Sequence, residues 1–371
     1  MNLSYWERTS WFSNIDFTIV GSGIVGLNCA LELRLKHPKA RILILEKGKL
    51  PQGASTKNAG FACFGSISEI LSDLKIHSEQ EVLQLVQDRF DGIQSLRTLL
   101  GDDAIGYQNN GGHELFLNQD VALYESCLKE LTRVNELLQP VFKNDAFKVT
   151  PNSFNFNGIR SNYISQVFEG QINTGKMMSA LVQLAQQKGI TIVNSTQVHS
   201  FEDVGAKVIV RTNDLEFTTK KLLIATNGFA AQLLSEKVKP ARAQVLITKP
   251  IKDLHIKGTF HLEEGYYYFR NIDNRILLGG GRNLDFKTEE TTEFGTTRLV
   301  ENKLQGLLKS VILPKTVFEI DYSWSGIMGV GKQKKPILKQ LSGNVACGVR
   351  LGGMGIAIGS TIGKKLANTL D

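Results

Sequence analysis

The chain has 371 residues, of which 42% are hydrophobic, and its 43 Lys and Arg against 36 Asp and Glu give a formal net charge of +7. This length exceeds the ~250–300 residues at which single hydrophobic cores stop growing, so we expect more than one domain. Basic and acidic residues are interspersed, whereas nucleic-acid-binding proteins cluster their basic residues. The charge therefore does not favour a nucleic-acid partner.

We expect neither a signal peptide nor a metal site. Residues 1–13 are polar and aromatic, unlike a signal peptide, and the most apolar window, residues 19–33, is too short to span a membrane. The cysteines lack the spacing of metal or redox motifs: Cys29, Cys63, Cys127 and Cys347. We therefore expect a cytoplasmic protein with reduced thiols, no metal and no membrane span.

Residues 16–46 have the pattern of a dinucleotide-binding unit. An apolar run over residues 17–20 is followed by Gly21-Ser22-Gly23-Ile24-Val25-Gly26 and then by helical spacing over residues 27–35. A second apolar strand over residues 41–45 ends at Glu46, about 20 residues after the third glycine. The glycines allow a tight turn, close approach to a pyrophosphate and close helix–strand packing, and Glu46 can accept hydrogen bonds from a ribose.

Residues 51–64 directly follow this unit. They are small and polar and then apolar, with no clear period. Small residues let a backbone lie against a flat ligand, and the Ser, Thr and Asn side chains can bond it. The alternative is an ordinary turn into the next helix; we favour the ligand-binding interpretation.

The rest of the chain alternates between helical and strand patterns. We predict helices over residues 69–100, 121–138, 176–188, 296–308 and 360–368, and strands over residues 113–117, 190–193, 197–201, 207–211, 216–219, 221–228, 244–248, 259–261, 266–271, 275–279 and 315–324. If the strand over residues 221–228 rejoins the first sheet, Thr226, Asn227 and Gly228 lie at its carboxyl edge, where ligands bind in such folds.

Aromatic residues cluster on the predicted strand over residues 266–271. Tyr266 and Tyr268 would face one side and Tyr267 and Phe269 the other, and the sequence leaves open which side lines a pocket. The candidate pocket residues are Tyr266, Tyr267, Tyr268, Arg270, Trp324 and Arg350. His113, which has no obvious partner in the sequence, is interpreted as structural.

These segments, in this order, resemble the D-amino-acid-oxidase-like family of FAD-dependent oxidoreductases, which includes glycine and sarcosine oxidases. The matching pieces are residues 19–46, 53–60, 170–198, 223–228, 266–281, 324–338 and 348–366. The resemblance implies an α/β fold: a Rossmann-like, glutathione-reductase-like FAD-binding domain with an inserted α+β substrate domain built on an antiparallel sheet. It implies an FAD-binding domain over residues 1–80, 165–240 and 322–371 and a discontinuous substrate domain over residues 81–164 and 241–321.

The resemblance also assigns the residues that would hold FAD. They are Gly21, Ser22, Gly23, Ile24, Gly26, Glu46, Lys47, Ser55, Thr56, Asn58, Ala59, Gly60, Val198, Thr226, Asn227, Gly228, Gly352, Gly353, Met354, Gly355 and Ile356. The last five would supply backbone amides near the pyrimidine edge of the flavin, where the reduced ring carries negative charge.

Three departures from the family pattern concern the substrate and the attachment of the flavin. Met328 lies near the position of an arginine that pairs with the substrate carboxylate in many amino-acid oxidases. The segment from Trp324 to Gly331 contains no cysteine, so we expect non-covalent FAD. Arg350 lies in the late glycine motif and either binds an anion or makes a structural salt bridge.

The resemblance implies oxidation of a small amine or amino acid at its C–N bond. Hydride would pass to flavin N5, the imine would be hydrolysed, and O2 or another acceptor would reoxidise the flavin. We take Tyr268, Trp324 and Arg350 as the candidate catalytic residues. The alternatives are a 2-hydroxy-acid dehydrogenase, a tRNA-modification module, an NAD-dependent dehydrogenase and a non-enzymatic flavoprotein.

Overall fold

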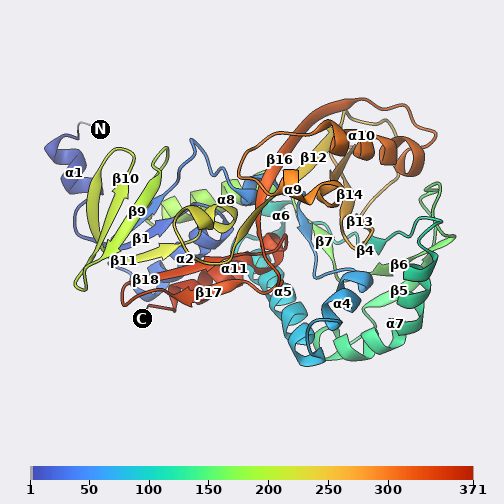
Figure 1. Cartoon of the computed structure of the whole chain (residues 1–371), viewed down its shortest axis with the longest axis horizontal. Coiled ribbons are helices and arrows are strands. Elements are labelled where there is room, and N and C mark those ends of the chain that lie inside the picture. The colour runs from blue at the N-terminus through green and yellow to red at the C-terminus, as the bar shows by residue number, and fades with distance from the viewer. Residues whose placement is uncertain (1–2, 371) are drawn as a thin grey trace.

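The computed structural model describes residues 3–370, which form two large sheets covered by helices (Figure 1). From edge to edge, the first sheet contains β17 (Ile337–Gln340), β18 (Val345–Val349), β11 (Glu216–Ile224), β1 (Ile15–Val20), β2 (Ile42–Leu45) and β8 (Thr191–Val193). From β18 to β8 these strands are parallel. The antiparallel strands β10 (Val208–Thr212) and β9 (Val198–Asp203) continue from β11.

The opening strand–helix–strand unit has the predicted form. β1 lies between β2 and β11, so the predicted strand over residues 221–228 does rejoin the first sheet. Gly21 makes the turn after β1 with a φ of +103°, a value that favours glycine. A Cβ at Gly26 would lie 1.9 Å from the carbonyl oxygen of Gly21, so only glycine lets the helix pack this closely on the turn.

The second sheet faces the carboxyl ends of the first. Its order is β16 (Ile320–Val330), β12 (Lys239–Thr248), β15 (Arg275–Gly280), β14 (Tyr267–Ile272), β13 (Thr259–Leu262), β4 (Gly112–Glu114), β6 (Asn162–Gln166) and β5 (Phe147–Pro151). All neighbours are antiparallel except β13 and β4. A small pair, β3 (Phe61–Ala62) and β7 (Gly170–Gln171), lies apart from both sheets.

Helices cover both sheets. They are α1 (Tyr5–Trp11), α2 (Ile24–Lys36), α3 (Ala54–Lys57), α4 (Ile67–Leu74), α5 (Glu79–Leu100), α6 (Asp102–Ile105), α7 (Val121–Phe142), α8 (Thr174–Gln187), α9 (Phe286–Glu289), α10 (Arg298–Leu307) and α11 (Gly355–Ala367). Helices α2, α8 and α11 share one apolar core with the first sheet, whereas α10 packs on the second. Within residues 3–370, no helix combines the length and apolar character needed to cross a bilayer.

Three predictions about the elements were wrong in detail. The single helix over residues 69–100 is two helices, because Ser78 caps α5 together with Glu81 and so starts a new helix. The predicted strand over residues 315–324 is instead β16, Ile320–Val330, and the last helix begins at Gly355 rather than at Ser360. The sequence analysis missed α1, β17 and β18. Each sheet is built from separated stretches of chain, and the predicted domain boundaries remain a prediction.

Candidate active site

A cavity of about 400 Å³ lies between the two sheets. The carboxyl ends of β1, β2 and β11 form one wall, and strands β12, β14 and β16 form another. Of the predicted cofactor residues, all line it except Ser22, Gly26 and Thr56. The glycine turn near the start of the chain and the segment from Gly352 to Ile356 near its end therefore meet at one cavity.

Glu46 organises the glycine turn. Its carboxylate accepts hydrogen bonds from the backbone N–H of Ser22 at 3.1 Å, from the Ser22 hydroxyl at 2.8 Å and from the backbone N–H of Gly48 at 2.9 Å. Glu46 is only 5% exposed, but it lines the cavity. Ser22 and Gly26 thus shape the turn from behind, and Glu46 both holds the turn and faces the ligand space.

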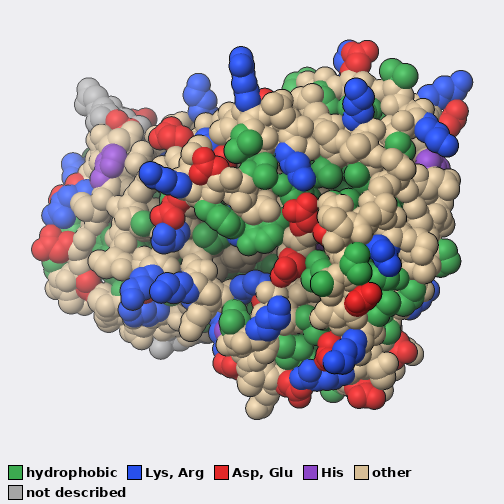
Figure 2. Space-filling model, turned by 45° about the vertical axis from the view of Figure 1, so that its right-hand side comes forward, with side chains coloured by type: hydrophobic (Ala, Val, Ile, Leu, Met, Phe, Trp, Pro, Cys, Tyr) green, Lys and Arg blue, Asp and Glu red, His purple; other side chains and the backbone are tan. Residues whose placement is uncertain are grey.

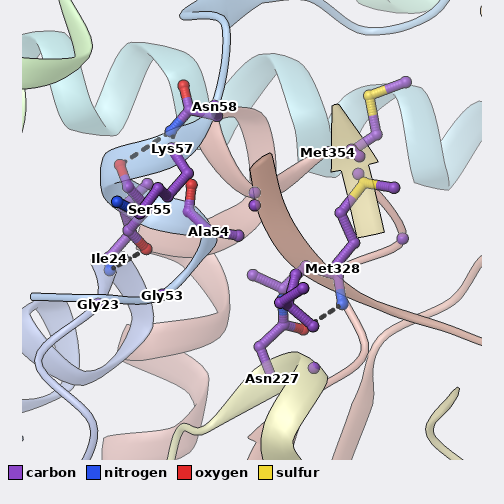
Figure 3. A pocket seen from close by; sticks show the side chains of 18 of the residues that line it. Gly23, Ile24, Gly53, Ala54, Ser55, Lys57, Asn58, Asn227, Met328 and Met354 are labelled. Atoms are coloured by element: carbon purple, nitrogen blue, oxygen red, sulfur yellow. Dashed lines mark hydrogen bonds between the residues drawn. The ribbon is translucent and has the colours of Figure 1, made fainter. Parts of the chain in front are cut away.

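The segment after β2 folds into a short turn of helix against α2, as Figure 3 shows. The N-cap of α2, Gly23, has no side chain to cap the helix, and the Ser55 hydroxyl instead accepts from Ile24 N at 3.0 Å. Asn58 donates to Ser55 O at 2.8 Å and accepts from Gly60 N at 2.8 Å. These bonds fix the small residues of the turn along the cavity wall.

The residues after β11 and the start of α11 form a further part of the cavity wall. Asn227 accepts from Leu351 N at 3.1 Å and so ties the two stretches together. The hydroxyl of Thr226 is buried with no hydrogen-bond partner among the described residues, although Thr226 lines the cavity. Helix α11 has no side-chain cap on its N-cap residue, Met354, which leaves its first amide groups available.

The side chains of residues 266–269 point to alternate faces, as the sequence pattern predicts. Tyr267 and Phe269 are fully buried in the core of the second sheet, whereas Tyr266 and Tyr268 line the cavity. Burial raises the pKa of the Tyr268 phenol to about 12, so it stays protonated at neutral pH and can donate a hydrogen bond.

Trp324 and Arg350, the other two predicted catalytic residues, do not line the cavity. The Trp324 indole donates to Lys57 O at 2.9 Å and thereby holds the turn that contains Ser55. Arg350 adopts a φ of +65°, and its guanidinium donates to Lys335 O at 3.0 and 2.9 Å. The structure therefore places both as supports for the cavity wall rather than as residues within it.

Arg270 supports the same wall from the second sheet. It is 2% exposed and donates to Ala59 O and, at 2.9 Å, to Ile172 O. Burial without a carboxylate partner lowers the pKa of Arg270 to about 10. The guanidinium remains charged at neutral pH and fixes the backbone of Ala59.

His261 and Glu69 line the cavity at the end near Tyr268, and the sequence analysis missed both. His261 Nδ1 lies 3.9 Å from Glu69 Oε2, and its Nε2 lies 3.8 Å from Glu169 Oε2. These carboxylates, with Glu114, hold the pKa of His261 at about 8 despite its burial. Strand β13, helix α4 and the loop before β7 bring them together, so no sequence spacing could have indicated this cluster.

Cys63 adjoins the same cluster. Its sulfur and one ligand atom each of Glu169 and His261 lie within 4.8 Å of one another. Glu169 already accepts from Phe64 N at 2.9 Å, and the two carboxylates beside His261 compensate its charge. We interpret the arrangement as an ion-pair cluster. By contrast, His113 lies outside the cavity lining, and its Nδ1 pairs with the Ser165 hydroxyl at 2.8 Å.

The geometry of the cavity, taken by itself, fits a dinucleotide. Two helices, α2 and α11, point N-termini without side-chain caps of their own at it, and such ends bind anionic groups. A Cβ at Gly23 would lie 2.8 Å from the Ser55 hydroxyl, so this turn has no room for a side chain. The unpartnered Thr226 hydroxyl supplies a polar group that a bound nucleotide would satisfy.

Comparison with known families decides which nucleotide. The sequence model of the DAO family, described as FAD dependent oxidoreductase, matches residues 16–369. The chain belongs to this family. It is therefore an FAD-dependent oxidoreductase, and the NAD-dependent alternative is set aside. Its match to the family covers both sheets and the whole cavity.

Individual relatives of this DAO-family chain act on different donors. It is 26% identical over 278 residues to the glycine oxidase of Geobacillus kaustophilus (strain HTA426), covering 71% of this chain and 69% of the relative. It is 22% identical over 326 residues to the L-2-hydroxyglutarate dehydrogenase of Escherichia coli (strain K12), covering 78% and 72%. Both identities are low, and the two relatives differ in substrate.

Solved structures show the same fold. The crystal structure of glycine oxidase from Geobacillus kaustophilus superposes with a TM-score of 0.76 at 20% identity, covering 96% of this chain and 94% of that one. L-α-glycerophosphate oxidase from Mycoplasma pneumoniae, whose structure has FAD bound, gives a TM-score of 0.73 at 16% identity, covering 96% and 94%. At these identities, the likeness to solved structures establishes only the fold of this chain.

Proposed function

We propose that this protein oxidises the C–N bond of a small amine or amino acid. Bound FAD would supply the acceptor for hydride from the carbon next to the nitrogen, and the imine product would be hydrolysed to a carbonyl compound. The glycine turn with Ser55 would hold the nucleotide, and the amides at the start of α11 would face the flavin ring. Tyr268, Tyr266, Met328 and His261 would surround the substrate.

The position of His261 between the carboxylates of Glu69 and Glu169 carries the proposal. Oxidation of a hydroxyl requires a base that removes the O–H proton, whereas an amine that binds uncharged needs none. His261 is the only imidazole among the residues lining the cavity. With a pKa of about 8 it is mostly protonated at neutral pH, so only a minor fraction of the enzyme holds it in the form that could act as that base. Glu69 and Glu264 also line the cavity. Their carboxylates suit the amino group of a substrate better than the second carboxylate group of a substrate such as 2-hydroxyglutarate.

A 2-hydroxy-acid dehydrogenase is the second candidate function, because the chain is similar to L-2-hydroxyglutarate dehydrogenases. The two candidates differ in the group that loses hydride. A tRNA-modification role finds no support on the face drawn in Figure 2, where Lys and Arg are interspersed with Asp and Glu.

Anaerobic reduction of the bound flavin tests the proposal. The holoenzyme is mixed with primary amines, N-methyl amino acids, D-amino acids and 2-hydroxy acids, and the visible absorption is followed. We expect bleaching by at least one amine or amino acid and none by 2-hydroxy acids. Bleaching by 2-hydroxy acids alone would establish the second candidate, and a flavin that no donor bleaches would favour a non-enzymatic flavoprotein.

The raised pKa of His261 predicts a pH dependence of stability. The folded state binds this proton more tightly than the unfolded state, where the pKa is 6.5. The stabilisation is complete below pH 6.5 and is lost as pH rises through about 8, and it amounts to about 2 kcal/mol. We expect the free energy of unfolding in urea to fall more between pH 6 and pH 9 in the wild type than in His261→Gln.

Glu114 also titrates in this range, because burial raises its pKa to about 7 and its titration lowers stability as pH rises. The charge of His261 opposes that rise, so both proteins are compared in a Glu114→Gln background, where this titration is absent. Equal pH dependence in the wild type and in His261→Gln would show that His261 is not protonated in the folded state, and the main support for C–N oxidation would be lost.

A further inference from the structure

We propose that helix α1 and a group of lysines beside it attach the protein to the surface of an anionic lipid bilayer. In Figure 1, α1 projects at one end of the molecule, away from the second sheet. The lysines surround the amino end of β1, whereas the cavity lies at its carboxyl end. The proposal is therefore independent of the substrate and of the reaction.

Helix α1 exposes three large aromatic side chains to solvent. Tyr5 is 71% exposed, Trp6 is 73% exposed and Trp11 is 46% exposed. The chain has only three tryptophans, and the third, Trp324, is partly buried and hydrogen-bonded. Tryptophan is highly buried on average, and exposed apolar groups that lie together mark interaction sites. Two exposed tryptophans on a helix of seven residues therefore indicate an interaction surface.

The helix that carries these aromatic side chains is fixed to the domain. Ser4 and Glu7 form a capping box at its start, which engages the only acidic side chain of α1. At its other end, the Arg41 guanidinium donates to Ser10 O. Phe12, directly after α1, is buried in an apolar core of the first sheet. The exposure of the aromatic rings is therefore a property of the folded protein and not of a frayed helix.

A shallow depression next to α1 is lined by basic side chains. Asp16 is the only acid among the described residues that line it, whereas four lysines do so: Lys36, Lys39, Lys220 and Lys221. Asp16 pairs with Lys220 at 2.8 Å and accepts from Arg41 N at 2.7 Å, while the Arg41 side chain reaches α1. The depression and the helix therefore adjoin, and we call them together the α1 surface.

The chemistry of the α1 surface matches an anionic bilayer better than a folded partner. Trp and Tyr favour the interface between membrane and water, and each lysine near an anionic surface adds to binding. The helix projects from the molecule, so its rings can enter a fluid headgroup layer without a matching socket. Leu35, beside Lys36 at the end of α2, is 73% exposed and adds apolar area. Attachment here would direct the cavity away from the bilayer.

Sedimentation of the holoenzyme with lipid vesicles tests this inference. Vesicles of phosphatidylcholine and phosphatidylglycerol in equal parts are compared with vesicles of phosphatidylcholine alone, at low and at high salt. We expect the wild type to sediment with the anionic vesicles at low salt and to be released from them at high salt. Binding to neutral vesicles should be at least about tenfold weaker. Equal binding to both kinds of vesicle would overturn the role of the lysines.

Variants of the α1 surface locate the contact. Trp6→Ser should lower the vesicle partition coefficient at least about tenfold, and Lys39→Glu should lower it by about the same factor. The matched controls are Tyr322→Ser and Lys315→Glu, which change exposed side chains in and just before β16 of the second sheet. Both should bind as the wild type does. Since all four side chains are exposed, each variant should keep its flavin and its unfolding midpoint.

Tryptophan fluorescence reports the contact directly. Anionic vesicles should shift the emission of the wild type to the blue, and Trp6→Phe should still bind but show a smaller shift. A wild type that does not sediment with anionic vesicles would overturn the proposal, as would wild-type binding by both Trp6→Ser and Lys39→Glu. A wild-type dimer that Trp6→Ser dissociates, seen by sedimentation velocity without lipid, would instead make the α1 surface a contact between two copies of this chain.

Discussion

Gly26→Ala should yield a protein without bound FAD. The new Cβ would lie 1.9 Å from the backbone oxygen of Gly21, and neither the turn nor α2 can move away without losing the packing of helix on strand. We expect a loss of about 3 kcal/mol or more in the free energy of unfolding, at the upper end of overpacking effects. The measurements are the ratio of flavin absorption to protein absorption after purification and the urea unfolding midpoint.

Gly306→Ala is the matched control for Gly26→Ala. Gly306 lies in α10, and nothing lies within 4 Å of a Cβ built there. Because alanine is the better helix former, this variant should keep its flavin and gain up to about 1 kcal/mol. If Gly26→Ala purified with a full complement of flavin and wild-type stability, the close contact between α2 and the glycine turn would not matter for cofactor binding.

Arg270→Met should weaken FAD binding although Arg270 does not line the cavity. The substitution leaves the buried carbonyls of Ala59 and Ile172 without their donors, at a cost of about 1–3 kcal/mol each. The freed backbone at Ala59 would then no longer be held against the ligand. We expect at least a tenfold rise in the FAD dissociation constant and a lower unfolding midpoint, measured by fluorescence titration of the apoprotein and by thermal unfolding.

Arg270→Lys distinguishes support of the wall from the simple presence of a charge. A lysine keeps the positive charge, but its single ammonium group cannot reproduce the forked geometry that reaches two carbonyls. We expect an FAD affinity between those of the wild type and Arg270→Met. Wild-type affinity in Arg270→Met would show that Ala59 keeps its position without Arg270.

The sequence was sufficient to predict the parts of the fold and site that depend on local spacing. The glycines at positions 21, 23 and 26 and the acid at position 46 indicated the nucleotide unit because each is required by the geometry of one short turn. The alternation of Tyr266 to Phe269 correctly indicated that the two faces differ. In both cases the pattern lies within a few residues of chain.

The remaining site residues could not be predicted because they depend on contacts between distant elements. Glu69 of α4 and His261 of β13 are far apart in the sequence and approach each other only in the folded chain, and Arg270 bonds the backbone of a loop far away in the sequence. Arg350 was placed in the pocket because it adjoins a glycine motif, but its φ of +65° turns the side chain toward Lys335. Local patterns do not encode such orientations.

The bond between Asn227 and Leu351 has a consequence for biosynthesis. A ribosome makes β1 and α2 first, but the wall that Leu351 and α11 contribute follows only after both sheets have been translated. Until then the nucleotide site lacks one wall, and α2 lacks its packing against α11. We therefore expect the complete nucleotide site to form only after the last segment of the chain has been made.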